Sequence, residues 1–182
     1  DWDASGDRQR DSTATAAHKD ALTAAVDADP IDGMEIVVDV GNGVGGVTAD
    51  ALVELGADVT TLNAQPDGSF PGRPSEPTAE TLTALCGQVA SGDADLGIAH
   101  DGDADRMMAV DETGTFVPKD VLLALFARRA VRAAGGGQVA VPVDTSLCVD
   151  DAVTDAGGEL VRTKVGDVFV AEAAAEPGAV FG

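Results

Sequence analysis

The chain has 182 residues, of which 45% are hydrophobic, so it can bury the core of more than one α/β unit. Its 32 acidic residues outnumber 11 basic ones and give a net charge of −21, which argues against nucleic acid or anionic membranes as partners. No apolar run approaches the ~20 residues of a membrane span. The scarcity of lysine and the excess of acidic residues are typical of proteins folded in molar salt, so we expect a halophilic source.

The N-terminus is polar and acidic and has no signal-peptide pattern. Cys86 and Cys148 stand alone without the spacing of a metal-binding pair. Isolated cysteines of this kind are typical of a reducing compartment. We therefore expect a cytoplasmic protein.

The first two thirds of the chain predict alternating helices and strands. Apolar periodicity and β-branched runs predict helices over residues 12–28, 47–56 and 78–92, and strands over residues 34–40, 58–63 and 95–100. Thr78 is the expected N-cap of the third helix, with Thr81 at the capping-box position. Prolines and glycines predict a loop over residues 64–77. A strand–turn–strand hairpin is expected over residues 106–117.

A second α/β series follows Pro118, which can begin a helix without losing a hydrogen bond. The predicted helices cover residues 120–135, 146–158 and 165–176, and the predicted strands cover residues 138–143, 159–163 and 179–182. Such alternation predicts two tandem α/β domains with mostly parallel sheets in three layers. We expect an N-terminal extension (1–13), a first domain (14–117) and a second domain (118–182). Because the sequence stops within an apolar strand, we expect the second domain to be truncated and the chain to be a fragment.

Residues 97–114, GIAHDGDADRMMAVDETG, place three aspartates at alternating positions after an apolar strand. One interpretation is a solvated surface loop, since acidic residues are abundant throughout the chain. A second is a calcium loop of the EF-hand type, but Arg106 stands where that loop needs glycine and the flanks predict strands. The third is a magnesium site formed by Asp101, Asp103 and Asp105.

The magnesium interpretation accounts for more of this loop than the others do. Alternate residues of an extended segment can direct their carboxylates to one side, and Mg²⁺ prefers oxygen ligands. Gly102 would let the backbone turn between ligands. Three carboxylates carry more negative charge than one Mg²⁺ neutralises. Arg106 would supply the further positive charge that the site needs in order to accept a phosphate oxygen. His100 is expected to pack beside the site, because a hard cation prefers oxygen to imidazole.

Gly41, Gly43 and Gly46 fit G-x-G-x-x-G between a strand and a helix, which is the setting of a dinucleotide site. The acidic residue expected about 20 positions later is absent, because the end of the next strand carries Asn63. The other interpretation is a tight strand–helix connection with close backbone packing. A non-catalytic nucleotide-binding or Ca²⁺-binding α/β module therefore remains the alternative to a phosphoryl-transfer enzyme.

Five segments together resemble the α-D-phosphohexomutases, the family of phosphomannomutase, phosphoglucomutase and phosphoglucosamine mutase. DGDADR resembles the metal-binding loop of that family. The other four resemble parts of its second and third domains: VVDVGNGVGG…LGADV, PDGSFPGRPSEPTAETL, RTKVGDVFVAEA and GAVFG. The resemblance runs from about residue 14 to residue 182. With the acidic composition, it implies a haloarchaeal phosphohexomutase, represented by domain 2 and most of domain 3.

The resemblance implies an enzyme that moves phosphate between O1 and O6 of a hexose, through a phosphoserine and a bisphosphate intermediate. Asp101, Asp103 and Asp105 would bind Mg²⁺, and Arg106 would stabilise charge on the transferred phosphate. Lys164, Gly166 and Asp167 would face the hexose phosphate. The serine motif of the T-x-S-H-N-P kind does not occur in this sequence. Domains 1 and 4 would be the missing partners, and the isolated chain would be inactive.

Overall fold

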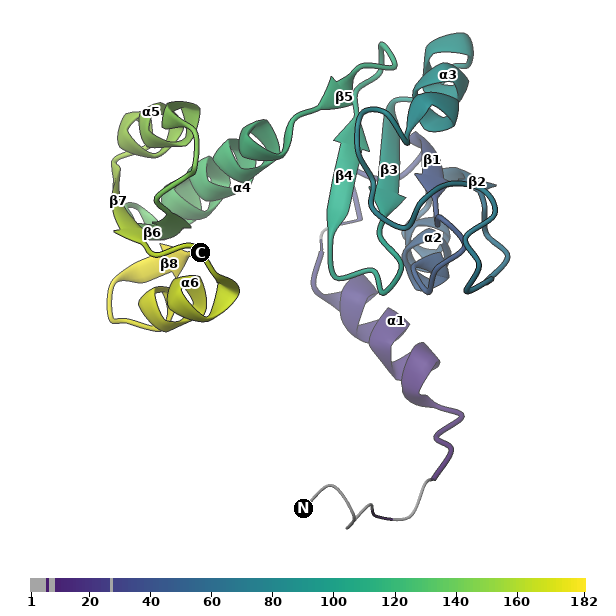
Figure 1. Ribbon diagram of the computed structural model, residues 1–182, viewed down its shortest axis with the longest axis horizontal. Coiled ribbons are helices and arrows are strands. Elements are labelled where there is room, and N and C mark those ends of the chain that lie inside the picture. The colour runs from purple at the N-terminus through teal and green to yellow at the C-terminus, as the bar shows by residue number, and fades with distance from the viewer. Residues whose placement is uncertain (1–5, 7–8, 27) are drawn as a thin grey trace. The chain divides into compact units, whose positions relative to one another are not determined.

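The computed structural model describes residue 6, residues 9–26 and residues 28–182 (Figure 1). The expected extension over residues 1–13 falls largely outside the described residues. The chain divides into two compact units, residues 1–116 and residues 117–182. Each unit is an α/β sheet with helices on both faces, so the predicted fold class is confirmed.

The first unit is built on a five-stranded mixed sheet with the order β2-β1-β3-β4-β5. Strands β1, β2 and β3 are parallel, and β4 is antiparallel to β3. A turn at Asp111–Gly114, closed by a 2.9 Å hydrogen bond, joins β4 to β5. The strands are β1 (Glu35–Asp39), β2 (Asp58–Leu62), β3 (Leu96–His100), β4 (Met107–Val110) and β5 (Phe116–Val117).

Strand β1 is buried on both faces because its residues alternate between two apolar clusters. Ile36, Val38 and Val40 pack on the side of α2 (Gly46–Glu54), whereas Val37 packs on the side of α3 (Thr83–Ser91). Helix α1 (Ala14–Ala24) packs on α2 and buries no residue completely. This double burial explains the continuous apolar run that predicted the strand.

The helix expected over residues 78–92 begins later, at Thr83. Thr78 and Thr81 do form the predicted reciprocal pair: the Thr78 N–H donates to the Thr81 hydroxyl at 2.8 Å, and the Thr81 N–H donates to the Thr78 hydroxyl at 3.4 Å. This box closes a separate turn ahead of the helix. The Thr81 hydroxyl also donates to the carbonyl of Glu76, which draws the turn back toward the preceding loop. The predicted helix start was therefore wrong by one turn.

The second unit has a three-stranded parallel sheet with the order β7-β6-β8. Val139 and Val141 of β6 pack against α4 and α5, whereas Ala140 lies beside Ala174 and Val170 of α6. Figure 1 shows α6 next to this sheet. Gly135, with φ of 75°, ends α4 in the left-handed region. The elements are α4 (Lys119–Ala134), β6 (Gly137–Pro142), α5 (Leu147–Asp155), β7 (Gly158–Thr163), α6 (Asp167–Ala174) and β8 (Ala179–Phe181).

Within the described residues, no helix combines the length and the apolar character needed to cross a membrane.

Candidate metal centre

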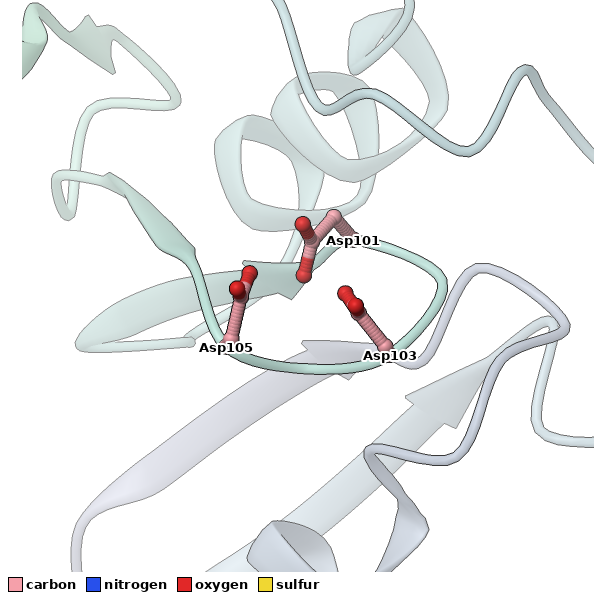
Figure 2. Close-up of side chains that lie close together, drawn as sticks. All are labelled: Asp101, Asp103 and Asp105. Carbon is pink, nitrogen blue, oxygen red and sulfur yellow. The ribbon is translucent and has the colours of Figure 1, made fainter. Parts of the chain in front are cut away.

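The three aspartates lie directly after β3, at the carboxyl end of the parallel part of the first sheet. Figure 2 shows the carboxylates of Asp101, Asp103 and Asp105 converging across the loop that carries them. One oxygen from each lies within 4.8 Å of the other two. We call residues 101–106 the metal loop. Loops at this edge of a parallel sheet are the usual location of sites in α/β proteins.

The donor set of the metal loop fits Mg²⁺. Magnesium binds oxygen at ~2.1 Å, so two ligands of one ion are at most about 4.2 Å apart, and oxygens that lie within 4.8 Å of one another need only a small adjustment to share an ion. Asp101 is buried, whereas Asp103 and Asp105 are exposed and leave the site open on one side. An open side suits an ion that keeps water ligands or shares a phosphate oxygen.

The sequence led us to expect an unusual backbone conformation at Gly102 of the metal loop. The structure instead has it at Ala104. Ala104 has φ of 61°, in the left-handed region where residues with a side chain are rare. Gly102 is needed for space instead, since a Cβ there would lie 3.0 Å from the ring of Phe70. Strained backbone of this kind is characteristic of functional loops.

Arg106 binds the buried aspartate through both its backbone and its side chain. Its Nε donates to Asp101 Oδ2 at 2.7 Å and its N–H donates to Asp101 Oδ1 at 3.2 Å. Burial would raise the pKa of Asp101, but these hydrogen bonds and the positive charge lower it overall. Nη1 of Arg106 pairs with Glu76 at 2.8 Å. The guanidinium is thereby held beside the carboxylates while remaining half exposed.

The exposed aspartates repel one another. The negative charge of Asp103 is the main cause of a raised pKa for Asp105, with smaller contributions from burial and from Asp101. A like charge that raises a carboxyl pKa disfavours the ionised pair. A bound cation removes that penalty, so the electrostatics of the loop favour a divalent ion.

The glycine loop, residues 41–46, packs closely against neighbouring loops at Gly41 and Gly43. A Cβ at Gly41 would lie 2.4 Å from the guanidinium of Arg73, and a Cβ at Gly43 would lie 2.5 Å from the carbonyl oxygen of Gly102. The N–H of Gly41 donates to Asp39, and the N–H of Val44 donates to Gly102. These donors are therefore not free for a pyrophosphate, and the interpretation as a tight connection is favoured.

A buried ion pair that the sequence analysis missed lies beneath this edge. Arg73 and Asp39 pair at 2.8 Å with side chains only 4% and 1% exposed. Arg73 belongs to the proline-rich loop of residues 64–77, which we call the strap. The signal in the sequence was Asp39 itself, because a charged residue in a buried strand requires a partner.

His100, the last residue of β3, packs beneath the metal loop and is buried. Its Nδ1 lies 3.1 Å from the carbonyl oxygen of Arg106, so Nδ1 carries the proton and donates. Nε2 of His100 is buried, and no described residue provides it with a hydrogen-bond partner. The ring therefore fastens the far end of the metal loop to the strand from which the loop starts.

The expected substrate residues lie in the second unit, from the end of β7 to the first residue of α6. Nζ of Lys164 lies 5.4 Å from the centre of the Phe169 ring, a cation–π contact. Gly166 precedes α6 with φ of 134°, and Asp167 lies in the first turn of that helix. These residues are exposed, so the loop of residues 163–167 presents polar groups to solvent.

Comparisons with known proteins match both units. The family models described as phosphoglucomutase/phosphomannomutase, alpha/beta/alpha domain II and domain III match residues 16–114 and residues 118–182. The chain is 50% identical over 182 residues to a probable phosphoglucosamine mutase of Methanopyrus kandleri and 48% identical over 182 residues to one of Methanosarcina barkeri. Both alignments include 100% of this chain, but they span only 40% and 41% of the length of those relatives.

A solved structure gives the same result. The X-ray structure of a phosphoglucomutase/phosphomannomutase family protein from Burkholderia thailandensis matches with a TM-score of 0.80 and 28% identity. The match covers 91% of this chain and 36% of that chain. Fold and site define an α/β protein with a candidate divalent-metal loop at the edge of a parallel sheet. More specifically, the chain belongs to the α-D-phosphohexomutase family and comprises its domains II and III, which confirms the resemblance.

Proposed function

We propose that this chain is the metal-binding and sugar-facing part of a Mg²⁺-dependent phosphohexomutase. The observation that carries the proposal is the convergence of three aspartate carboxylates, with Arg106 beside them, at the carboxyl end of β3. The reaction would exchange phosphate between O1 and O6 of a hexose. A phosphoserine elsewhere in the enzyme would phosphorylate the hexose phosphate, and the resulting bisphosphate would return its other phosphate to the serine.

In this proposal Asp101, Asp103 and Asp105 would hold a magnesium ion, which would supply positive charge to offset the negative charge of the phosphoryl group. Asp101 stays ionised because Arg106 binds both of its oxygens. Arg106, whose guanidinium lies half exposed beside these carboxylates, would stabilise charge on the transferred oxygens. Glu76 limits the freedom of that side chain.

We place the sugar phosphate against the loop of residues 163–167. Lys164 offers a cation, Gly166 offers backbone, and Asp167 offers a carboxylate for hydroxyl groups. The curated relatives carry the name probable phosphoglucosamine mutase, and this supports glucosamine phosphate as the hexose. The partners would be that substrate and domains 1 and 4 of the same polypeptide.

The alternative of a non-catalytic nucleotide or calcium module has less support. The backbone donors at Gly41 and Val44 are used within the protein, and the flanks of the metal loop are strands. An EF-hand loop lies between helices and needs glycine where Arg106 stands.

We also propose a cytoplasmic location and a halophilic source. Cys86 and Cys148 are both unpaired, as suits a reducing compartment. The net charge of −21 and the few lysines support folding in concentrated salt. The relatives named above are archaeal, which is consistent with a haloarchaeal source.

The test is Asp103→Asn in the full-length enzyme. Loss of a metal ligand should lower kcat/KM for hexose phosphates roughly 10²-fold or more, which corresponds to several kcal/mol of lost transition-state stabilisation. Glu112→Gln removes the same charge from an exposed turn outside the loop and serves as the control. Near-wild-type activity of Asp103→Asn would disprove the assignment. The isolated chain has no T-x-S-H-N-P motif and should show no turnover.

A further inference from the structure

Arg73 uses every donor of its guanidinium inside the protein. Nε donates to Asp39 Oδ2 at 2.8 Å, Nη1 donates to the carbonyls of Pro74 and Ser75 at 3.0 and 3.3 Å, and Nη2 donates to the carbonyls of His100 and Asp39 at 2.6 and 3.4 Å. One side chain therefore joins the strap to the carboxyl ends of β1 and β3. A lysine, with a single nitrogen, cannot reproduce this fork.

The contact with His100 connects Arg73 to both ends of the metal loop. The His100 carbonyl that accepts from Arg73 immediately precedes Asp101 in the chain. The His100 ring donates to the carbonyl of Arg106, the last residue of the loop. Any movement of Arg73 would therefore shift the residue from which Asp101 projects and the residue that binds Asp101.

The glycine loop and the strap are shaped around this arginine. Gly41 leaves space for the guanidinium, because a Cβ there would lie 2.4 Å from Nη2. Asp39, which neutralises the charge of Arg73, also accepts from the N–H of Gly41 and from the amide of Asn63. Phe70 of the strap packs against Gly102 in the metal loop. The arginine thus occupies a fully hydrogen-bonded cradle directly behind the site.

We infer that Arg73 is a positioning residue for the metal loop, which acts by fixing the His100 carbonyl and so the direction of the Asp101 carboxylate. The inference rests on the proposed metal site and adds a residue that does not touch the ion. Partners behind a ligand shell typically change metal affinity by about 10- to 100-fold when they are lost. A merely structural ion pair would change stability and leave metal binding in the folded protein unaltered.

The test measures Mn²⁺ binding to the folded chain by electron paramagnetic resonance, in molar KCl. Arg73→Lys keeps the charge opposite Asp39 but loses the fork. Gly41→Ala keeps the arginine and displaces it with a methyl group. Gly33→Ala is the matched control, because Gly33 has a similar φ of 76° but no atom within 4 Å of its new Cβ. Circular dichroism melts confirm that each variant is folded.

We expect the Mn²⁺ dissociation constant to rise about 10-fold or more in Arg73→Lys and in Gly41→Ala, and to be unchanged in Gly33→Ala. The spectral line shape of bound Mn²⁺ should also change in the two affected variants. Folded Arg73→Lys and Gly41→Ala proteins with wild-type affinity and line shape would overturn the inference alone. Wild-type and Asp103→Asn proteins that bind Mn²⁺ equally would overturn the proposed metal site and this inference together.

Discussion

The carboxyl edges of the two sheets are built in contrasting ways. Among the described residues, all five buried polar or charged side chains belong to the first unit and lie at or next to that edge: Asp39, Asn42, Arg73, His100 and Asp101. In the second unit, the loop of residues 163–167 is largely exposed: Val165 within it is 60% exposed, and Val168 just after it is 67% exposed.

The difference teaches where rigidity is concentrated. Burying charged groups is costly unless each one is paired and hydrogen-bonded, and a satisfied network then holds a single geometry. A divalent ion requires such a geometry. The loop that we propose to face the sugar is built from exposed groups instead, such as Lys164 over the ring of Phe169.

The largest effect should come from salt, since it decides whether the two edges can be compared in folded protein at all. The net charge is −21, so the carboxylates of the chain repel one another. This repulsion is screened beyond about 10 Å at ~0.1 M salt and beyond about 3 Å at ~1 M. We expect the melting midpoint, followed by circular dichroism, to rise from ~0.05 M to ~3 M KCl. A melting midpoint that is constant or falls over this series would contradict the prediction of a halophilic source.

The next effect is a difference between the two units in the cost of losing an ion pair. Arg73→Met leaves the buried Asp39 without a counter-charge and should lower the free energy of unfolding by about 3–5 kcal/mol. Arg162 pairs with Asp150 in the second unit, where both side chains are about a third exposed, so Arg162→Met should cost less than about 1 kcal/mol. Urea unfolding in molar KCl gives both values. Equal costs would remove the contrast between the two edges.

A smaller effect is expected from a glycine at the contact between the glycine loop and the metal loop. Gly43→Ala would place a Cβ 2.5 Å from the backbone oxygen of Gly102, and such overpacking costs about 1–3 kcal/mol. Gly46→Ala, in the same segment, meets no atom within 4 Å and should be neutral or slightly stabilising. Amide hydrogen exchange should quicken in the metal loop only for Gly43→Ala. Faster exchange in both variants would indicate general loosening.

The smallest effect should lie in the second unit. Exposed cation–π contacts contribute about 0.5–1 kcal/mol, so a double-mutant cycle of Lys164→Met and Phe169→Leu should give a coupling energy within that range. The measurement is the unfolding free energy of the wild type, both single variants and the double variant. A coupling energy well above about 1 kcal/mol would mean that the contacts of this loop are as strong as those at the carboxyl edge of the first sheet.

Local patterns were sufficient to predict much of the fold and the metal loop. Strand β1 follows from its β-branched run, and the aspartates from their alternate spacing after β3. The strap was predicted as a loop, but its contacts could not be predicted, because residues 64–77 have no periodicity and their partners are distant in sequence. Arg73 meets Asp39 only through the folded sheet. The same reason hid Glu76, whose contact with Arg106 spans 30 positions.

The space for the Arg73 guanidinium exists only because Gly41 lacks a side chain, and this has a consequence for how such sequences diverge. The two positions carry one constraint between them, so we expect them to covary among relatives. A lineage that exchanges the arginine for a smaller residue releases the glycine, whereas one that keeps the arginine cannot change the glycine first. Gly41 therefore reflects the space that Arg73 requires, and its place in a G-x-G-x-x-G spacing is not by itself evidence of a nucleotide site.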